Sequence, residues 1–383
     1  MNNRVSEIVA PRMSWYLWRM IFKAIVTRFF KRAGIECDGS DPGDPQIRDP
    51  RFYRRVLFGG SVGLGDSYME GWWECERIDL FIEKLLRSGV SDGVPRFDDW
   101  VLKLVSRIVD RQDRVRSLRV AKEHYDNSPE FYVGVLGEKA KYIFYTCAFW
   151  KDPNESLEEA QLNKADMLCQ KAGLKPGMTI LDIGCGWGGF LAYAADTYGT
   201  EGIGLSISEP QIEYARQRYS DPRIDFRLQD YRDFKDKADA VVSICMIEHV
   251  GPRHHREYFQ RAYDALAENG RFALQCILSK AKSSMSDPWL DKRIFPGGNL
   301  LMMDQLKSAT KGLFDIVHEE FFPDDYVRTL TAWCDNMRAL RDTIVARYGI
   351  EHFRMYEYYF MMCAGGFRSG RITVGQFVLV KAS

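Results

Sequence analysis

Apolar runs alternate with amphipathic stretches through the second half of the chain. Runs typical of buried strands lie at 178–183, 202–207, 224–228, 238–244 and 271–277. Helical patterns lie before or between them at 156–173, from 190 onward, at 209–218 and at 254–267. Strands that alternate with helices in this way predict a parallel, doubly wound α/β sheet, with ligands bound at the carboxyl ends of the strands.

The remaining patterns predict mostly helices. Helical stretches at 324–347 and 351–367 follow the fifth strand, and an apolar run at 372–380 predicts a final strand. Nearer the N-terminus, residues 78–88 have a helical pattern. The glycine-rich stretch 58–73 has neither the preceding strand nor the spacing of a nucleotide-binding loop, so we expect a structural turn there.

A polar segment containing Gly and Pro, residues 91–96, predicts a domain boundary. The stretch after it is helical in pattern and rich in arginine. We therefore expect a smaller, mainly helical front domain over 1–96, a basic linker helix over 97–122 and a larger domain over 123–383.

The first helical pattern, residues 12–32, carries Trp and Phe side chains interleaved with Arg and Lys. Basic side chains outnumber the single acidic one, Glu7, over residues 1–35. A basic, aromatic, amphipathic helix of this kind can lie in a membrane interface. The same pattern also fits a helix that packs on its own domain with its charges in water, and the sequence leaves both interpretations open.

The composition is that of a soluble globular protein. Of the 383 residues, 46% are hydrophobic and 28% are charged, and the formal net charge is zero, so no overall field attracts nucleic acid. The nine cysteines are scattered without a C-x-x-C pair, which argues against a metal site or disulfide framework and favours a reducing compartment. No apolar run reaches the roughly 20 residues of a membrane span, and no signal peptide is evident.

A glycine-rich turn follows the first predicted strand of the sheet, at 184–189. Such a turn can simply be tight, or it can let a ligand approach the backbone at a helix start. A dinucleotide-binding domain would have an acidic residue after the second strand, and here Ser206, Ile207 and Ser208 follow instead. This weakens the dehydrogenase interpretation.

Several separated motifs together resemble the cyclopropane-fatty-acyl-phospholipid synthases, which are S-adenosylmethionine-dependent enzymes. The stretches that carry the resemblance are 182–189, 229–233, 247–252, 145–148, 287–289, 294–297, 363–367 and, in the front domain, 63–73. The resemblance covers nearly the whole chain. It implies a Rossmann-like methyltransferase domain behind a lipid-docking front domain.

The resemblance also implies a site for S-adenosylmethionine. The residues expected to bind it are Tyr145, Thr146, Gly184, Gly186, Ser206, Gln211, Asp230 and Tyr231. The two glycines would face its methionine part, the Ser and Gln its ribose, and the Asp and Tyr its adenine. The Tyr–Thr pair would close over the methionine end.

Methyl transfer to an isolated alkene builds a carbocation, and ring closure then requires a base. In the family that base is a bound bicarbonate, whose ligands correspond here to Cys147, Glu248, Tyr326 and the backbone of Ile277. Gln275 stands where the family has a histidine; an amide can donate a hydrogen bond but carries no proton or charge. Cys363 matches a further family cysteine, for which a structural role is favoured because the chemistry needs no thiol.

The resemblance therefore predicts cyclopropane formation on unsaturated phospholipids in a bilayer, by a cytoplasmic enzyme attached peripherally to the inner, anionic face of the membrane. A homodimer is expected, and a nucleic-acid partner is not. Because Gln275 replaces a histidine, methylation without ring closure stays open as an alternative. A membrane-binding relative without catalysis is a less favoured one.

Overall fold

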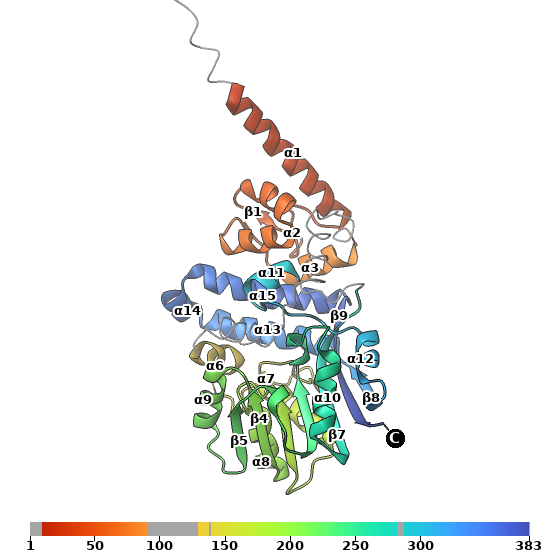
Figure 1. Cartoon of the computed structure of the whole chain (residues 1–383). Coiled ribbons are helices and arrows are strands. Elements are labelled where there is room, and N and C mark those ends of the chain that lie inside the picture. The colour runs from red at the N-terminus through yellow and green to blue at the C-terminus, as the bar shows by residue number, and fades with distance from the viewer. Residues whose placement is uncertain (1–9, 90–128, 138, 282–286, 383) are drawn as a thin grey trace, which may run out of the picture.

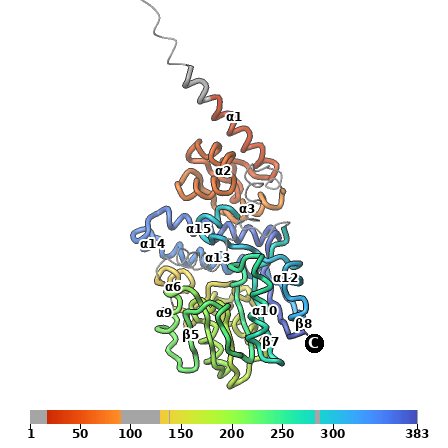
Figure 2. The backbone as a smooth tube through the Cα atoms, in the orientation of Figure 1, coloured from red at the N-terminus to blue at the C-terminus, as the bar shows by residue number. Residues whose placement is uncertain are grey.

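The computed structural model describes residues 10–89, 129–137, 139–281 and 287–382, with side chains from residue 17 onward in the first helix. Its elements form three tiers (Figure 1). The front domain with α1 lies at one end, long helices form the middle, and a β-sheet with its covering helices lies at the other end. The tube in Figure 2 shows the same order from red to green, with the blue C-terminal helices between front domain and sheet.

The sheet has seven strands in the order β5-β4-β3-β6-β7-β9-β8. Their bounds are β3 Thr179–Ile183, β4 Glu201–Ser206, β5 Ile224–Leu228, β6 Ala238–Ile244, β7 Leu266–Ser279, β8 Phe314–Phe321 and β9 Ile372–Lys381. Strand β9 runs antiparallel to both of its neighbours, while β3 to β7 are parallel. The predicted α/β sheet is confirmed, and the edge strand β8 is one that the apolar pattern did not reveal.

Helices cover both faces of the sheet. One face packs against α7 Leu157–Ala172, α8 Gly189–Tyr198 and α9 Glu209–Arg218, and the other against α10 His255–Ala265 and α12 Met303–Thr310. Helix α7 begins with a capping box formed by Ser156 and Glu159 and ends at Gly173 in the left-handed conformation. This helix supports the back of the site described below.

The middle tier contains α11 Pro288–Arg293, α13 Pro323–Ala339, α14 Arg341–Tyr348 and α15 Ile350–Arg368, with α6 Pro129–Gly137 beside them. The single helix predicted over 324–347 is therefore two helices, which meet at Leu340. The apolar pattern continued across the break because both helices bury side chains in the same core.

The front domain consists of α1 Ala10–Arg32, α2 Arg51–Met69, α3 Ile78–Arg87 and a small sheet of β1 Gln46–Ile47 and β2 Trp73–Glu74. The turn expected over 58–73 is wrong for most of its length, because α2 continues to Met69. Only Gly60 departs from helical geometry, with φ of 52° and ψ of −132°, and it kinks the helix. Gly65 lies within the helix, and a neighbouring element explains why no side chain is present there: a Cβ on Gly65 would meet Trp289 of α11 at 2.4 Å.

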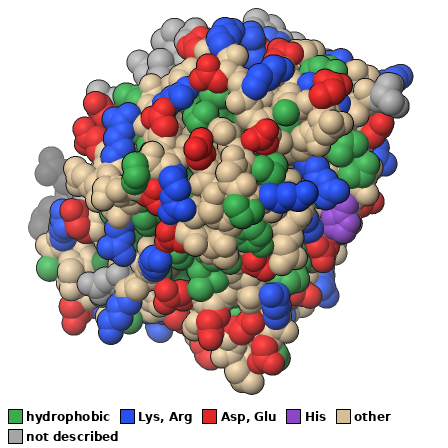
Figure 3. Space-filling view, turned by 90° about the horizontal axis from the view of Figure 1, so that it is seen from below, with side chains coloured by type: hydrophobic (Ala, Val, Ile, Leu, Met, Phe, Trp, Pro, Cys, Tyr) green, Lys and Arg blue, Asp and Glu red, His purple; other side chains and the backbone are tan. Residues whose placement is uncertain are grey.

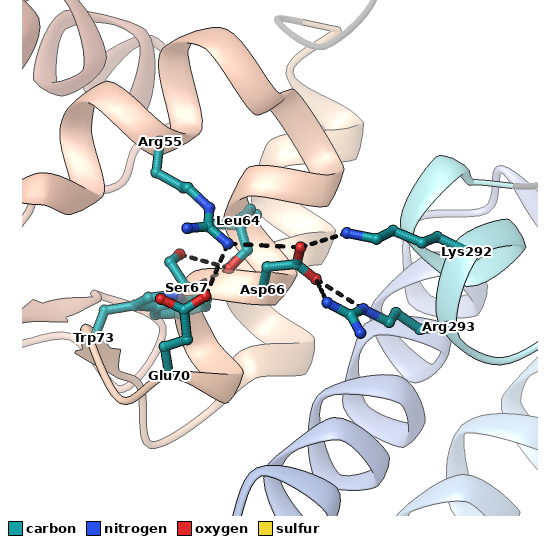
Figure 4. A network of polar contacts seen from close by, with 8 residues as sticks. All are labelled: Arg55, Leu64, Asp66, Ser67, Glu70, Trp73, Lys292 and Arg293. Carbon is teal, nitrogen blue, oxygen red and sulfur yellow. Dashed lines mark hydrogen bonds and ion pairs between the residues drawn. The ribbon is translucent and has the colours of Figure 1, made fainter.

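The front domain and the middle tier share one apolar core, which includes Phe52 and Trp73 in front and Trp289 and Tyr358 behind. A polar cluster reinforces the contact (Figure 4). The buried Asp66 of α2 pairs with Lys292 at 2.7 Å and Arg293 at 3.0 Å, both on α11. Burial would raise the pKa of Asp66, but the hydrogen bond from Lys292 and the charge of Arg293 hold it below its usual value. The front domain is thus fixed on the middle tier by packing and by a partly buried ion cluster.

Helix α1 extends beyond the rest of the front domain (Figure 1). Its outer half exposes Leu17, Trp18, Met20, Ile21 and Ile25, while its inner half buries Val26 and Phe30. Within the described part of the chain, no helix combines the length and apolarity that crossing a membrane requires. The predicted linker helix over 97–122 lies outside the described residues, so the domain boundary stays a prediction.

Candidate active site

One cavity of about 1210 Å³ connects the sheet with the front domain. At the sheet its walls are the turns after β3, β4, β5 and β6. At the other end they are apolar side chains of α1, α2 and α3, among them Phe30, Leu57 and Leu86. Helices α13 and α15 form the wall between the two ends. The space therefore joins a polar end at the sheet to an apolar end in the front domain.

The glycine turn lies at the polar end. Gly184 and Gly188 have φ of 89° and 84°. A Cβ on Gly184 would meet Met246 at 2.5 Å, and a Cβ on Gly188 would meet Phe226 at 2.7 Å. Gly186 also has a positive φ, 51°, but a Cβ there would meet no atom within 4 Å. The packing of the turn thus requires both Gly184 and Gly188, and Gly184 also lines the cavity. Gly186 keeps open the space beside a helix start, where a ligand can approach the backbone.

The residues after β4 come together as expected. The Ser206 hydroxyl donates to Gln211 Oε1 at 3.1 Å, and the backbone N–H of Ser208 donates to Ser206 Oγ at 3.1 Å. Both Ser206 and Gln211 line the cavity. Because Gln211 accepts through its oxygen, its amide N–H groups remain to donate, which suits the hydroxyls of a ribose.

After β5, Asp230 and Tyr231 also line the cavity. Asp230 accepts from the backbone N–H of Arg232 at 2.9 Å and pairs with its guanidinium at 2.6 Å, so it starts the short helix Tyr231–Asp233. The Tyr231 ring packs edge-on against Tyr258. This arrangement holds the aromatic ring rigidly beside the cavity.

Tyr145 and Thr146 close the same end from a segment without regular structure. Two side chains of α7 hold this segment. Gln161 donates to the Thr146 carbonyl at 2.9 Å, and Lys164 donates to the Thr146 hydroxyl oxygen at 2.9 Å. When Lys164 is charged it can only donate, and the hydroxyl proton of Thr146 is then left to be donated to a ligand.

Glu248 also lines the cavity, in the short helix Ile247–His249 after β6. The backbone N–H of Ile277 donates to its Oε1 at 2.6 Å, whereas Oε2 is buried without a hydrogen-bond partner in the described structure. Burial raises the pKa of Glu248 to about 7, against the hydrogen bond from Ile277, which lowers it. The unpaired oxygen is therefore a strong acceptor, or a donor when protonated.

Two further candidates, Tyr326 and Cys363, face the same space. The Tyr326 ring packs on Phe367 at 4.6 Å between centroids, and burial raises the pKa of its hydroxyl well above the usual value. Burial also raises the pKa of the Cys363 thiol, so this cysteine stays protonated. Tyr326 is thus available as a hydrogen-bond donor, and Cys363 behaves as an apolar wall residue.

The other two candidates, Cys147 and Gln275, are fully buried and are not among the described residues that line the cavity. The Cys147 thiol donates to the Ala148 carbonyl at 3.2 Å, and burial raises its pKa. Gln275 lies behind it, with its Nε2 at 3.5 Å from the Cys147 carbonyl. These two residues support the residues that line the cavity without lining it themselves.

The structure adds three buried ionisable residues that the sequence analysis did not assign to the site. Burial raises the pKa of Asp182 to about 7 and lowers that of Lys164 to about 7, and the two charges favour each other. Burial also lowers the pKa of His249 to about 4, so its ring is neutral. Lys164 falls on the apolar face of an amphipathic helix, between Ala160 and Leu168. A lysine at such a position in the sequence is the pattern from which its burial could have been predicted.

Asp182 Oδ1 is buried at the cavity without a hydrogen-bond partner in the described structure. Together with the open face of Gly186 and the donors at Thr146 and Gln211, it forms a set complementary to an amino acid joined to a nucleoside. The residues present therefore fit S-adenosylmethionine. In the described ranges no group of three His, Cys, Asp or Glu side chains could hold a metal ion.

Figure 3 shows the face at the sheet end of the molecule, where basic and acidic side chains are interspersed. A face of this kind produces no strong field of one sign.

Comparison with known proteins agrees with this geometry. Residues 112–377 match the family described as mycolic acid cyclopropane synthetase. The chain is 39% identical over 375 residues to the cyclopropane-fatty-acyl-phospholipid synthase of Escherichia coli (strain K12), an alignment that covers 98% of this chain and 95% of that one. It is 35% identical over 275 residues to the S-adenosylmethionine-dependent methyltransferase UmaA of Mycobacterium tuberculosis, covering 67% of this chain and 95% of that one.

A solved structure, that of the mycolic acid cyclopropane synthase CmaA1 complexed with SAH and CTAB, has the same fold as the sheet-containing part. Its TM-score is 0.64 at 28% identity, and the match covers 69% of this chain and 98% of that one. The Escherichia coli relative, by contrast, aligns over nearly the full length of both chains, front domain included.

Proposed function

The chain is an enzyme of the mycolic acid cyclopropane synthetase family, and from this premise we propose that it adds a methylene group from S-adenosylmethionine across the cis double bond of unsaturated phospholipid acyl chains. The observation that carries the proposal is the single cavity of about 1210 Å³. It joins a polar end that fits the methyl donor to an apolar end that fits an acyl chain, and Glu248 is among its lining residues.

S-adenosylmethionine would supply an electrophilic methyl group at the polar end. The chain's own residues then have three tasks. Gly184, Gly186 and Thr146 hold the methionine part, and Ser206 and Gln211 hold the ribose. Asp230 and Tyr231 border the adenine.

The apolar end accepts the alkene and excludes water from the cation that methyl transfer creates in the acyl chain. Phe30, Leu57 and Leu86 supply apolar surface there, and Tyr326 and Cys363 also line the cavity. Apolar walls keep water and other nucleophiles away, which suits a short-lived carbocation.

Ring closure requires removal of a proton, and we propose that bicarbonate bound near Glu248 and Tyr326 is the base. Support comes from the unpaired Oε2 of Glu248, which can donate to an anion when protonated, and its pKa of about 7 makes the protonated form accessible. The Ile277 N–H donates to Glu248 Oε1 in the structure. An anion at Ile277 must therefore share that donor. Cys147 and Gln275, which do not line the cavity, would act on the base indirectly, through the residues that contact it.

We also propose that the enzyme is cytoplasmic, works as a homodimer and docks peripherally on the anionic inner face of the membrane through the front domain. Support comes from the exposed Leu17, Trp18 and Met20 of α1, interleaved with Arg19 and Lys23. Such a helix fits a headgroup region, with aromatic rings in the boundary layer and cations toward phosphates.

Methylation without ring closure is the alternative product. Gln275 favours it, because an amide cannot carry a proton, and the relative UmaA is described as a methyltransferase rather than a cyclopropane synthase. Both products add the same mass to the chain, so mass alone does not separate them.

The deciding experiment combines the purified enzyme, methyl-labelled S-adenosylmethionine and liposomes of a phospholipid with a cis-unsaturated chain. The labelled fatty acids are then treated with ozone, which cleaves alkenes and leaves cyclopropanes intact. Labelled chains that resist cleavage support the proposal. Labelled chains that are cleaved replace it with simple methylation, and absence of label in the lipid overturns both.

A further inference from the structure

A ladder of polar side chains crosses three neighbouring strands beneath the active site. Gln275 on β7 pairs in register with Gln376 on β9, which pairs in register with Glu320 on β8. Side chains directly opposite each other on adjacent strands share one face of the sheet. The face is the one covered by α7, whose last turn contributes Lys171. We call these four residues the amide ladder.

The hydrogen bonds of the amide ladder are short and run in one direction. Lys171 Nζ donates to Glu320 Oε2 at 2.6 Å and to Gln376 Oε1 at 2.8 Å. Gln376 Nε2 donates to Gln275 Oε1 at 2.9 Å. Gln275 Nε2 then lies 3.5 Å from the Cys147 carbonyl and 3.8 Å from Cys245 Sγ.

The ammonium group of Lys171 fixes this direction. An amide side chain can be turned over with little change of shape, but an ammonium group has donors only. Gln376 must therefore face Lys171 with its oxygen, and it can then offer only its N–H groups to Gln275. Gln275 accepts through its oxygen, so its own N–H groups face the active-site side.

The opposite orientation would be unfavourable at both ends. With Gln275 turned over, its oxygen would face the Cys147 carbonyl oxygen, and its N–H groups would face those of Gln376. Both Gln275 and Gln376 are fully buried, so no water compensates for an unpaired group. One lysine at the rim thus decides which end of a buried amide reaches the site.

We propose that Lys171 and Gln376 are positioning residues that present Gln275 as a donor to the Cys147 carbonyl, and so hold the segment 145–148 in place. This segment has other anchors as well: Gln161 and Lys164 bind Thr146 from α7, and Thr329 accepts from the Ala148 N–H at 3.1 Å. The amide ladder adds an anchor at the Cys147 carbonyl, between the two residues that those contacts hold. In this way a neutral amide can serve at the position of the family's histidine.

The inference rests on the proposed function only for the identity of the methyl donor, so binding of S-adenosylmethionine is measured by calorimetry without lipid. The decisive variant is Gln376→Glu. Its carboxylate can still accept from Lys171 but offers only acceptors to Gln275, which must turn over. We expect affinity for S-adenosylmethionine to fall about tenfold; the thermal midpoint is measured alongside, to establish that the variant is folded at the assay temperature.

Gln217→Glu, at an exposed position of α9, is the matched control and should bind as the wild type does. Lys171→Arg keeps the donors and should bind normally, whereas Lys171→Met removes them and should bind more weakly. In a Gln275→Leu background the change Gln376→Glu should cause no further loss, because no amide remains to be turned over.

Two results overturn the inference: wild-type affinity in Gln376→Glu, or the same tenfold loss in the Gln275→Leu background. The second result would show that Gln376 acts by some route other than Gln275. A wild type that binds S-adenosylmethionine but modifies no lipid would contradict the proposed function and leave this measurement valid.

Discussion

Ile277 donates its backbone N–H to Glu248 Oε1 at 2.6 Å, and the second oxygen of that carboxylate is buried without a hydrogen-bond partner in the described structure. Glu248, after β6, and Ile277, in β7, thus form a site in which one carboxylate oxygen is hydrogen-bonded and the other is not. A carboxylate in that position is costly to charge when no ligand is present.

Replacing Glu248 should stabilise the protein at high pH. Its pKa is about 7 in the folded chain against 4.5 as a model group, so between those values the folded state holds a proton that the unfolded state has lost, and stability falls as pH rises. We expect Glu248→Gln to gain about 3 kcal/mol relative to the wild type at pH 8 and almost nothing at pH 4. Urea unfolding at both pH values measures this. Equal differences at the two values would contradict it. Turnover should nevertheless be severely reduced, with binding of S-adenosylmethionine unchanged.

The same carboxyl group should make bicarbonate binding depend on pH. Below a pH of about 7 Glu248 is protonated and can donate to the anion; above it, two like charges face each other. We expect the KM for bicarbonate, corrected for the fraction of total carbonate present as that ion, to rise between pH 6.5 and 8.5. In Glu248→Gln the rise should be absent. A KM that does not change with pH in the wild type would remove Glu248 from the anion site.

Gly186 should be needed for the ligand and not for the fold. It has positive φ, and a Cβ there meets nothing within 4 Å, as is also true of Gly177 before β3. Alanine at either position costs about 1 kcal/mol through backbone strain. Only Gly186→Ala should weaken binding of S-adenosylmethionine, by about tenfold or more, because its added methyl enters the cavity. Similar affinity in both variants would show that the turn does not contact the ligand.

Reversing charge on α1 should weaken attachment to anionic liposomes. Changing Arg19 and Lys23 together to Glu removes two attractions of about 1 kcal/mol each and adds repulsion. We expect at least a tenfold loss in liposome sedimentation assays, larger at low salt than at high salt. The same reversal of Lys175 and Lys235, exposed on the sheet-containing part, is the control and should have little effect. Unchanged binding by the α1 variant would assign that helix to packing alone.

Asp66→Asn should loosen the front domain. Its carboxylate pairs with Lys292 and Arg293 at the domain contact, and its side chain is only 5% exposed (Figure 4). Removing one partner from a buried ion cluster leaves the other charges uncompensated, and we expect a loss of about 2 kcal/mol in urea unfolding. Asp236→Asn, in an exposed pair with Arg227, should cost under about 1 kcal/mol. Equal losses would mean that the cluster adds nothing beyond an ordinary surface pair.

The apolar pattern was sufficient to predict the central strands, because buried parallel strands are continuous apolar runs. It could not reveal β8, an edge strand that is mostly exposed and contains the consecutive polar residues His318, Glu319 and Glu320. It also misjudged 58–73, where Gly65 is explained by the approach of Trp289 on α11. That contact joins residues more than two hundred positions apart, and no local pattern contains it.

The candidate site was partly predictable from motifs, since Ser206, Gln211, Asp230 and Glu248 all line one cavity. The position of Gln275 behind Cys147 was not, because it depends on the register of β7 with β9. The amide ladder arises in the same way: Lys171, Glu320 and Gln376 are far apart in the sequence, and each alone is an unremarkable polar residue. Cross-strand pairing gives them a common role.

Gly365 has a consequence for comparing architectures within a family of this kind. A Cβ there would come within 2.6 Å of the Asp79 carbonyl oxygen on α3, so the front domain can lie this close to α15 only where the side chain is absent. A larger residue at the equivalent position would be incompatible with the same seating. The residue at this one alignment position should therefore distinguish chains whose front domain packs on α15 in this way from chains in which it does not.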